Sequence, residues 1–128
     1  MTATSGRLAA RSIDALASMR IAAGVLAWLN PRLTARLFGM SGGNGDSHYA
    51  WRLFGVRDVV LGIGTLRSSG AQRSAFAAAG LACDVADGTA GAIGLHRNDF
   101  TRSTAGAPVL VPAIAVAIGA WALSGRGR

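Results

Sequence analysis

Lysine and glutamate are both absent from this 128-residue chain, so 13 arginines and 6 aspartates carry all of its side-chain charge apart from two histidines. Exclusive use of arginine beside abundant alanine and glycine is typical of a high-GC bacterial genome. The net charge of +7 therefore says little about binding partners. The arginines stand singly or in loose pairs between apolar segments, with no basic run and no interleaved aromatics. This distribution argues against a nucleic-acid-binding protein.

Charged, aromatic and cysteine residues are also scarce. Only 15% of the residues are charged, against about 25% in an average soluble domain. Only 6% are aromatic, so alanine and glycine dominate the apolar residues and would let helices approach closely in lipid. The single cysteine, Cys83, excludes an intrachain disulfide. The composition favours a membrane protein, with a soluble, alanine-rich helical bundle as the alternative.

Four apolar segments predict the fold, and turn signals such as Asn30-Pro31 separate them. They cover residues 12–29, 48–66, 74–95 and 108–123. Segments of this length span a hydrocarbon core about 30 Å thick. Asp14 and Arg20 in the first segment argue against a cleaved signal peptide. We therefore predict one all-α domain over residues 1–128, an integral membrane four-helix bundle, with a short interfacial helix within residues 32–40.

The distribution of arginines over the connections predicts the orientation. One set lies at the N-terminus, in the second connection and at the C-terminus: Arg7, Arg11, Arg67, Arg73, Arg126 and Arg128. A smaller set lies in the first and third connections: Arg32, Arg36, Arg97 and Arg102. Because arginine is enriched on the cytoplasmic side, we expect both termini in the cytoplasm and the protein in the bacterial inner (plasma) membrane.

Charged residues inside the segments are the most informative feature. Arg20, Arg57, Asp58 and Asp84 lie at segment midpoints, and Asp87 follows Asp84 by one turn. Each costs about 2.5–3.5 kcal/mol at the centre of a membrane helix, so these residues must face inward and pair. Together with Arg52, near the outer end of the second segment, they predict a neutral set: Arg20, Arg52 and Arg57 against Asp58, Asp84 and Asp87.

Helical spacing predicts which faces carry these charges. Arg20, Asp58, Asp84 and Asp87 each lie in a stripe of mostly small residues at intervals of three or four. Arg57 points about 100° away from Asp58 on the same helix. The stripes are Ile13, Ala17, Arg20, Gly24 and Ala27; Trp51, Gly55, Asp58 and Gly62; and Ala77, Gly80, Asp84, Asp87, Gly91 and Gly94. The first three helices should therefore converge on one polar centre. The fourth segment is wholly apolar and is expected to be a lid toward lipid.

Two interpretations of the polar centre remain open. The ion pairs can simply specify how the helices dock, or the centre can be a cavity for a substrate or for protons. The surplus of charge favours the cavity, because one pair would suffice for docking. Apolar surroundings and arginine neighbours shift carboxyl pKa values in opposite directions, so such a centre can hold one acid protonated and another ionised.

The leading functional hypothesis is a membrane-embedded acid–base enzyme, an isomerase or cyclase acting on a lipophilic small molecule. Asp58 or Asp84 would donate the proton, and Asp87 would tune its neighbours. Arg20 and Arg57 would orient the substrate or hold an oxyanion, and the substrate-binding set also includes Arg52 and Trp51. We expect membrane lipid around a homo-oligomer, and no cofactor or metal. A proton-coupled exporter of cations is the second hypothesis, although a neutral centre argues against it; the third is an accessory subunit.

Motif matches are few. Asp84-Val85-Ala86-Asp87-Gly88 is similar to the start of the metal-binding signature of membrane CDP-alcohol phosphotransferases, but Gly91-Ala92 follows and the second aspartate pair is missing. His48 with Asp46, and His96 with Asp99, offer a weak alternative metal site. The stretch Trp51-Arg52-Leu53-Phe54-Gly55-Val56-Arg57-Asp58-Val59-Val60-Leu61-Gly62, with Asp84-Val85-Ala86-Asp87, resembles a family of small uncharacterised bacterial four-helix membrane proteins. That resemblance implies the fold and the importance of Arg57, Asp58 and Asp84, but no activity.

Overall fold

The computed structural model describes residues 3–100 and 106–124, and these residues form helices without any strand. The helices are α1 (Ala3–Leu29), α2 (Pro31–Leu37), α3 (Gly45–Arg67), α4 (Gly70–His96) and α5 (Ala107–Ser124). The all-α prediction is confirmed, and each predicted segment lies in one long helix. α1, α3 and α4 extend beyond the predicted bounds because their polar ends continue the helix past the apolar run. Arg102, Arg126 and Arg128, which helped to orient the chain, lie outside the described residues.

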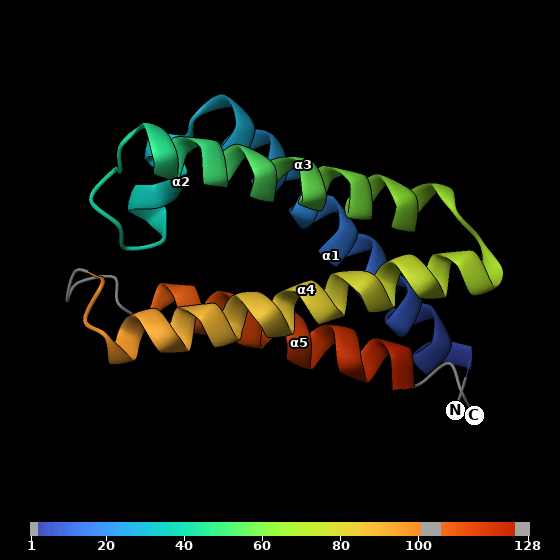
Figure 1. Ribbon diagram of the computed structural model, residues 1–128. Coiled ribbons are helices and arrows are strands. Elements are labelled where there is room, and N and C mark those ends of the chain that lie inside the picture. Colours follow the sequence, from blue (N-terminus) through green and yellow to red (C-terminus); the bar gives the residue numbers. More distant parts are fainter. Residues whose placement is uncertain (1–2, 101–105, 125–128) are drawn as a thin grey trace.

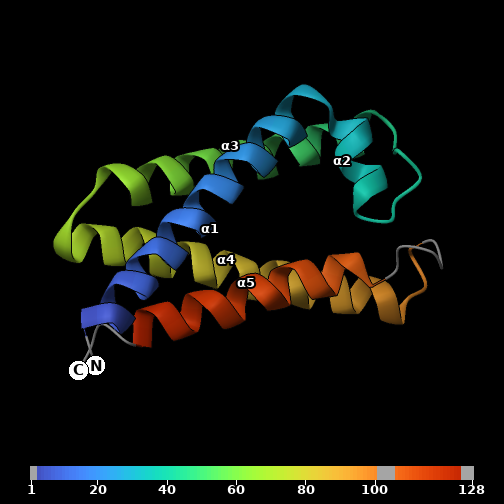
Figure 2. The same ribbon diagram turned by 180° about the vertical axis from the view of Figure 1, so that it is seen from behind.

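The long helices pack as two pairs, α1 with α3 and α4 with α5 (Figure 1). The pairs meet where α3 turns into α4, and this is also the end where α1 begins and α5 ends (Figure 2). There Ala9, Ile13 and Ala122 form a small apolar core. Toward α2 the two pairs diverge (Figures 1 and 2). The fold therefore has a closed end and an end where the two layers stand apart.

The α1–α3 seam depends on two glycines that face each other. A Cβ atom on Gly55 would lie 2.5 Å from the carbonyl oxygen of Gly24, and a Cβ on Gly24 would lie 2.5 Å from that of Gly55. Both are closer than a real side chain tolerates, so the backbones touch only because neither residue has a side chain. Gly62 makes a similar approach to Ala17 further along the seam. The stripes predicted from spacing are thus the packed faces of these helices.

The connections follow from local chemistry. The Asn30 side chain accepts a hydrogen bond from the Leu33 backbone N–H at 3.1 Å, and Pro31 then opens α2. The predicted short helix therefore exists, over Pro31–Leu37. Asn44 and Ser47 form a reciprocal capping box at the start of α3. Gly42 and Gly43, with φ of 86° and 72°, provide the left-handed turn before it.

Proline 112 shapes the contact between α5 and α4. It lies inside α5, where its missing N–H leaves the Pro108 carbonyl without its usual helical donor. That carbonyl lies against Gly91 of α4, at a position where a Cβ atom would collide with it. The glycine therefore lets α4 and α5 approach closely at the proline-altered turn.

Most buried apolar side chains are small, and most large apolar side chains are exposed. The buried apolar residues are Ala9, Ile13, Ala17, Ala27, Ala35 and Ala122, and none of the large side chains described is fully buried. Large apolar side chains on every helix are instead exposed, for example Leu29 at 73% and Leu110 at 60%. Within the described residues, α1 and α5 are long and apolar enough to cross a membrane by length and composition. α3 and α4, which carry most of the inward charges, are not.

Candidate functional site

The predicted polar centre forms where α1, α3 and α4 face one another. Asp58 on α3 and Asp84 on α4 are buried, with 5% and 8% of their surface exposed. They occupy the same faces as the buried glycines of their helices, namely Gly55 and Gly62 on α3 and Gly80, Gly91 and Gly94 on α4. Helical spacing therefore located both side chains correctly.

Arg20 joins three helices through one guanidinium group. Nη2 donates to a carboxylate oxygen of Asp84 and, at 2.8 Å, to the Gly80 carbonyl oxygen; Nη1 lies 3.4 Å from Oδ1 of Asp58. The missing side chain of Gly80 makes room for it, because a Cβ atom there would lie 3.0 Å from Nε of Arg20. Since α1 and α4 make little direct backbone contact, this side chain is a main link between them.

Arg57 binds the third carboxylate. Nη2 and Nη1 donate to the two carboxylate oxygens of Asp87 at 2.7 and 3.2 Å, a bidentate pair that fixes both side chains. Nη2 also lies 3.3 Å from Oδ1 of Asp58, the next residue along α3. The guanidinium carbon lies 4.8 Å from the ring centroid of Phe54. Asp58 thus lies between both arginines and connects the two ion pairs into one network.

Arg52 does not belong to this network. It is exposed, and its Nε lies 3.4 Å from the Trp28 carbonyl oxygen. The expected neutral set of six charges is therefore reduced to two arginines and three aspartates. With every group ionised, the polar centre has a formal charge of −1. One carboxylate in excess is the main electrostatic feature of the site.

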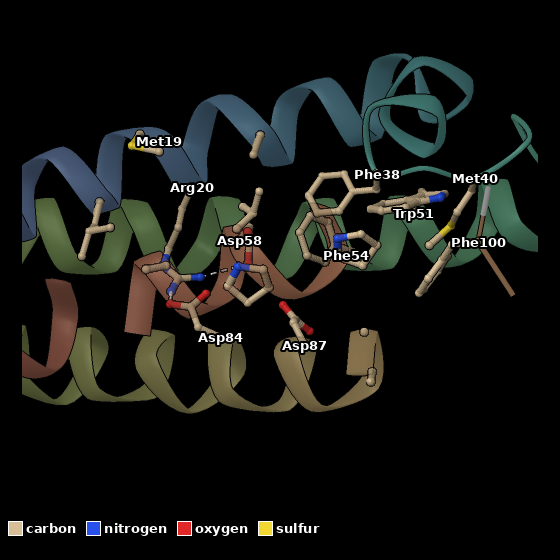
Figure 3. Close-up of a pocket in the computed structure, with 18 residues that line it drawn as sticks. Met19, Arg20, Phe38, Met40, Trp51, Phe54, Asp58, Asp84, Asp87 and Phe100 are labelled. Carbon is tan, nitrogen blue, oxygen red and sulfur yellow. Dashed lines mark hydrogen bonds and ion pairs between the residues drawn. The ribbon is translucent and has the colours of Figure 1, made fainter. Parts of the chain in front are cut away.

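A cavity of about 290 Å³ lies between the two helix pairs, with this centre at one end. Arg20, Asp58, Asp84 and Asp87 line its polar part (Figure 3). The remaining walls are apolar: Leu16, Met19, Ala23, Phe38, Met40, Trp51, Phe54, Ala90, Gly91, Phe100, Pro108, Val111, Pro112 and Ala115. A mostly apolar cavity with a few convergent polar groups is typical of a small-molecule site.

Aromatic side chains gather at the other end of the cavity (Figure 3). The Trp51 ring lies 5.2 Å from that of Phe38 and 5.4 Å, edge-on, from that of Phe54. Trp51 was predicted to contact substrate, and it does line the cavity. Sequence reasoning missed Phe38, Phe54 and Phe100. Phe54 had a usable signal, since it precedes Asp58 by one helical turn.

The cavity extends to the protein surface beside exposed residues of α1 and α5. Met19 on α1 and Val111 on α5 both line it, yet they are 65% and 49% exposed. One side of α5 therefore forms a wall of the cavity, while large apolar side chains on the same helix are exposed.

A separate ion pair lies outside the cavity lining. Nη2 of Arg73 on α4 lies 2.6 Å from Oδ1 of Asp14 on α1, and 3.4 Å from the Ala10 carbonyl oxygen. This pair joins α1 to α4 a second time, nearer the closed end. The Asp14 side chain is half exposed, and neither residue of this pair lines the cavity.

The polar side chains that line the cavity are mainly charged ones, from Arg and Asp. In residues 3–100 and 106–124, no three His, Cys, Asp or Glu side chains are grouped so as to hold a metal ion. Nε2 of His48 lies 2.8 Å from the Gly42 carbonyl oxygen at the start of α3. The charged groups that face the cavity are three carboxylates and one guanidinium, which can bind a polar group or exchange a proton with it.

No protein-family model, curated protein or solved structure matches the chain.

Proposed function

We propose that this chain is a multi-pass membrane protein whose long helices all lie within the bilayer. The size-sorted distribution of apolar residues supports this proposal, because lipid would cover the exposed Leu, Ile, Val and Trp side chains while small residues pack between helices. α3 and α4 are less apolar, but their central charges face Arg20 and one another rather than lipid. Both termini would lie on the same, cytoplasmic side.

Membrane insertion predicts a definite fractionation result. The protein made in bacteria should remain in the membrane pellet after alkaline carbonate extraction and should leave it only in detergent. Reporter domains fused after Arg128 and in the connection around Asn98 should report opposite sides of the membrane. Release by carbonate, or both fusions on the same side, would contradict the proposal.

Within the membrane, we propose that the cavity is an acid–base site for a lipophilic small molecule, with isomerase or cyclase chemistry. The observation that carries this proposal is that three carboxylates share two guanidiniums at the polar end of an apolar cavity. One carboxylate can hold a proton while the other two neutralise the arginines. Asp58 and Asp84 line the cavity and are the candidate donors. Asp87 is held by Arg57, so both are positioned to tune Asp58.

The test combines ligand capture with isotope exchange. Native mass spectrometry of detergent-released protein should find a co-purified lipophilic molecule. After incubation in D₂O, that molecule should gain deuterium at carbon, because an acid–base site protonates and deprotonates its substrate reversibly. The isosteric variants Asp58→Asn and Asp84→Asn should be folded and should lose the exchange. Asp14→Asn is the matched control, since it removes a carboxylate outside the cavity lining. This variant should keep the deuterium exchange.

A molecule that binds but never exchanges at carbon in the wild type would contradict the enzyme. A stoichiometric larger protein with an empty cavity would instead support an accessory subunit. The same spectra give the copy number and so test the proposed homo-oligomer.

One observation also favours a second candidate, a proton-coupled exporter. The neutral polar centre that the sequence predicted argues against an exporter of cations. In the structure, however, Arg52 lies outside the ion-pair network, so the network is formally negative. Such a centre can exchange a proton for a cation. Uptake of a cationic probe into vesicles, driven by a pH gradient and lost in Asp84→Asn, would support the exporter over the enzyme.

A further inference from the structure

The oxygen atoms of Asp58 and Asp84 are unequally used. Within the described residues, the hydrogen bonds to Asp58 all end on Oδ1, and the one to Asp84 ends on Oδ2. Oδ2 of Asp58 and Oδ1 of Asp84 are left over. Among the side-chain nitrogen and oxygen atoms of the described residues, only Nε of Arg73 is fully buried and has no hydrogen-bond partner. The two unused aspartate oxygens are therefore not fully buried. Both residues line the cavity, and each has an acceptor oxygen to which no donor of the described residues binds.

The guanidinium groups, by contrast, are already engaged. Arg20 donates to Asp84, to the Gly80 carbonyl and to Asp58. Arg57 pairs with Asp87 and Asp58, stacks on Phe54 and does not line the cavity. An anionic ligand would find few free donors and would meet excess carboxylate charge. A cation would meet two free acceptor oxygens and a formal charge of −1.

Resting on the proposed function, we infer that the ligand is a lipophilic nitrogen base that is bound as a cation. Its ammonium or iminium N–H groups donate to Oδ2 of Asp58 and Oδ1 of Asp84. Its apolar body lies along Phe38, Trp51 and Phe54, whose rings also attract cations. Binding of the neutral base transfers one proton: the aspartic O–H bond breaks, the nitrogen gains that hydrogen, and the carboxylate keeps the electron pair.

The volume of the cavity limits the size of this ligand. The cavity measures about 290 Å³, at the small end of the range of about 300–1,000 Å³ that is typical of small-molecule pockets. The ligand therefore has on the order of ten to fifteen non-hydrogen atoms inside the cavity. A longer tail would leave through the opening beside Met19 and Val111, where α1 and α5 are exposed.

Three probes with one carbon skeleton test the inference. 4-Phenylbutylamine, 4-phenylbutanol and 4-phenylbutyrate are close to the expected size and differ in charge. Their binding to the full chain in lipid nanodiscs should be measured by calorimetry at pH 7.5. We expect the amine to bind about tenfold or more tightly than the alcohol, with the carboxylate weakest. In Asp58→Asn and Asp84→Asn the amine should lose this advantage while the alcohol binds as before; Asp14→Asn should behave as wild type.

The outcomes separate this inference from the proposed function. If the alcohol binds as tightly as the amine, the cationic ligand is wrong and the lipophilic cavity stands. If the carboxylate binds best, the arginines rather than the aspartates recognise the ligand, and the inference is overturned. If none of the three binds to a folded protein, both the ligand class and the cavity function fail. Should an asparagine variant not fold, the ranking of the probes on the wild-type chain still decides between these outcomes.

Discussion

Replacement of Arg20 by methionine is expected to lower the free energy of unfolding by about 3–5 kcal/mol, the usual cost of leaving a buried charge without its partner. Arg20 is the partner of Asp84 and one of two partners of Asp58, and its side chain is 13% exposed. Without it, Asp84 keeps no ion-pair partner among the described residues, and α1 loses a main tie to α4. Thermal or denaturant unfolding in detergent, followed by circular dichroism, measures the effect.

Two further variants make the Arg20 experiment specific. Arg52→Met removes an exposed arginine with one long hydrogen bond, so its effect should stay within about 0.5 kcal/mol. The double variant Arg20→Met with Asp84→Leu should recover much of the loss, because it removes both members of the pair and leaves Asp58 with Arg57. If Arg20→Met unfolded like the wild type, the ion pairs of Arg20 would not be what holds α1 to α4.

Replacement of Gly55 by alanine is expected to cost about 1–3 kcal/mol, as overpacking of a close contact usually does. The added Cβ would lie 2.5 Å from the Gly24 carbonyl oxygen and 3.2 Å from the Trp28 backbone nitrogen. Both are backbone atoms, which cannot rotate away, so α1 and α3 must separate. Helix propensity favours alanine by up to about 1 kcal/mol, and the packing cost should exceed that gain. Separation would also move Arg20 away from Asp58.

A glycine elsewhere on α3 provides the matched control. Gly45 begins the helix, and apart from its chain neighbours and its own helix backbone no atom of the described residues lies within 4 Å of the position of an added Cβ. Gly45→Ala should therefore be neutral or stabilising by up to about 1 kcal/mol, because it only restricts the unfolded chain. Equal stability changes in the two variants, measured by the same unfolding curves, would mean that the α1–α3 seam is not close-packed at Gly55.

Much of the local structure followed from the sequence. The four long helices, the short helix after Asn30-Pro31 and the inward faces of α1, α3 and α4 were all predicted. These features depend on residues three or four positions apart, or on a single cap, so a linear pattern contains them. The burial of Asp58 and Asp84 followed for the same reason, since each lies in a stripe of small residues.

The tertiary structure alone decided how these faces combine. Balancing the charges of the sequence predicted that Arg52 faces inward with the other charged residues. In the structure Arg52 is exposed and lies outside the network, which is therefore formally negative instead of neutral. Phe38 reaches the cavity from the C-cap position of α2, and Phe100 reaches it from the connection after α4, so neither lies on one of the long predicted helices. α5 is apolar all round, so nothing in its sequence showed which side would form a cavity wall. Such features depend on which helices pair and how the pairs diverge, and these are contacts between residues far apart in the chain.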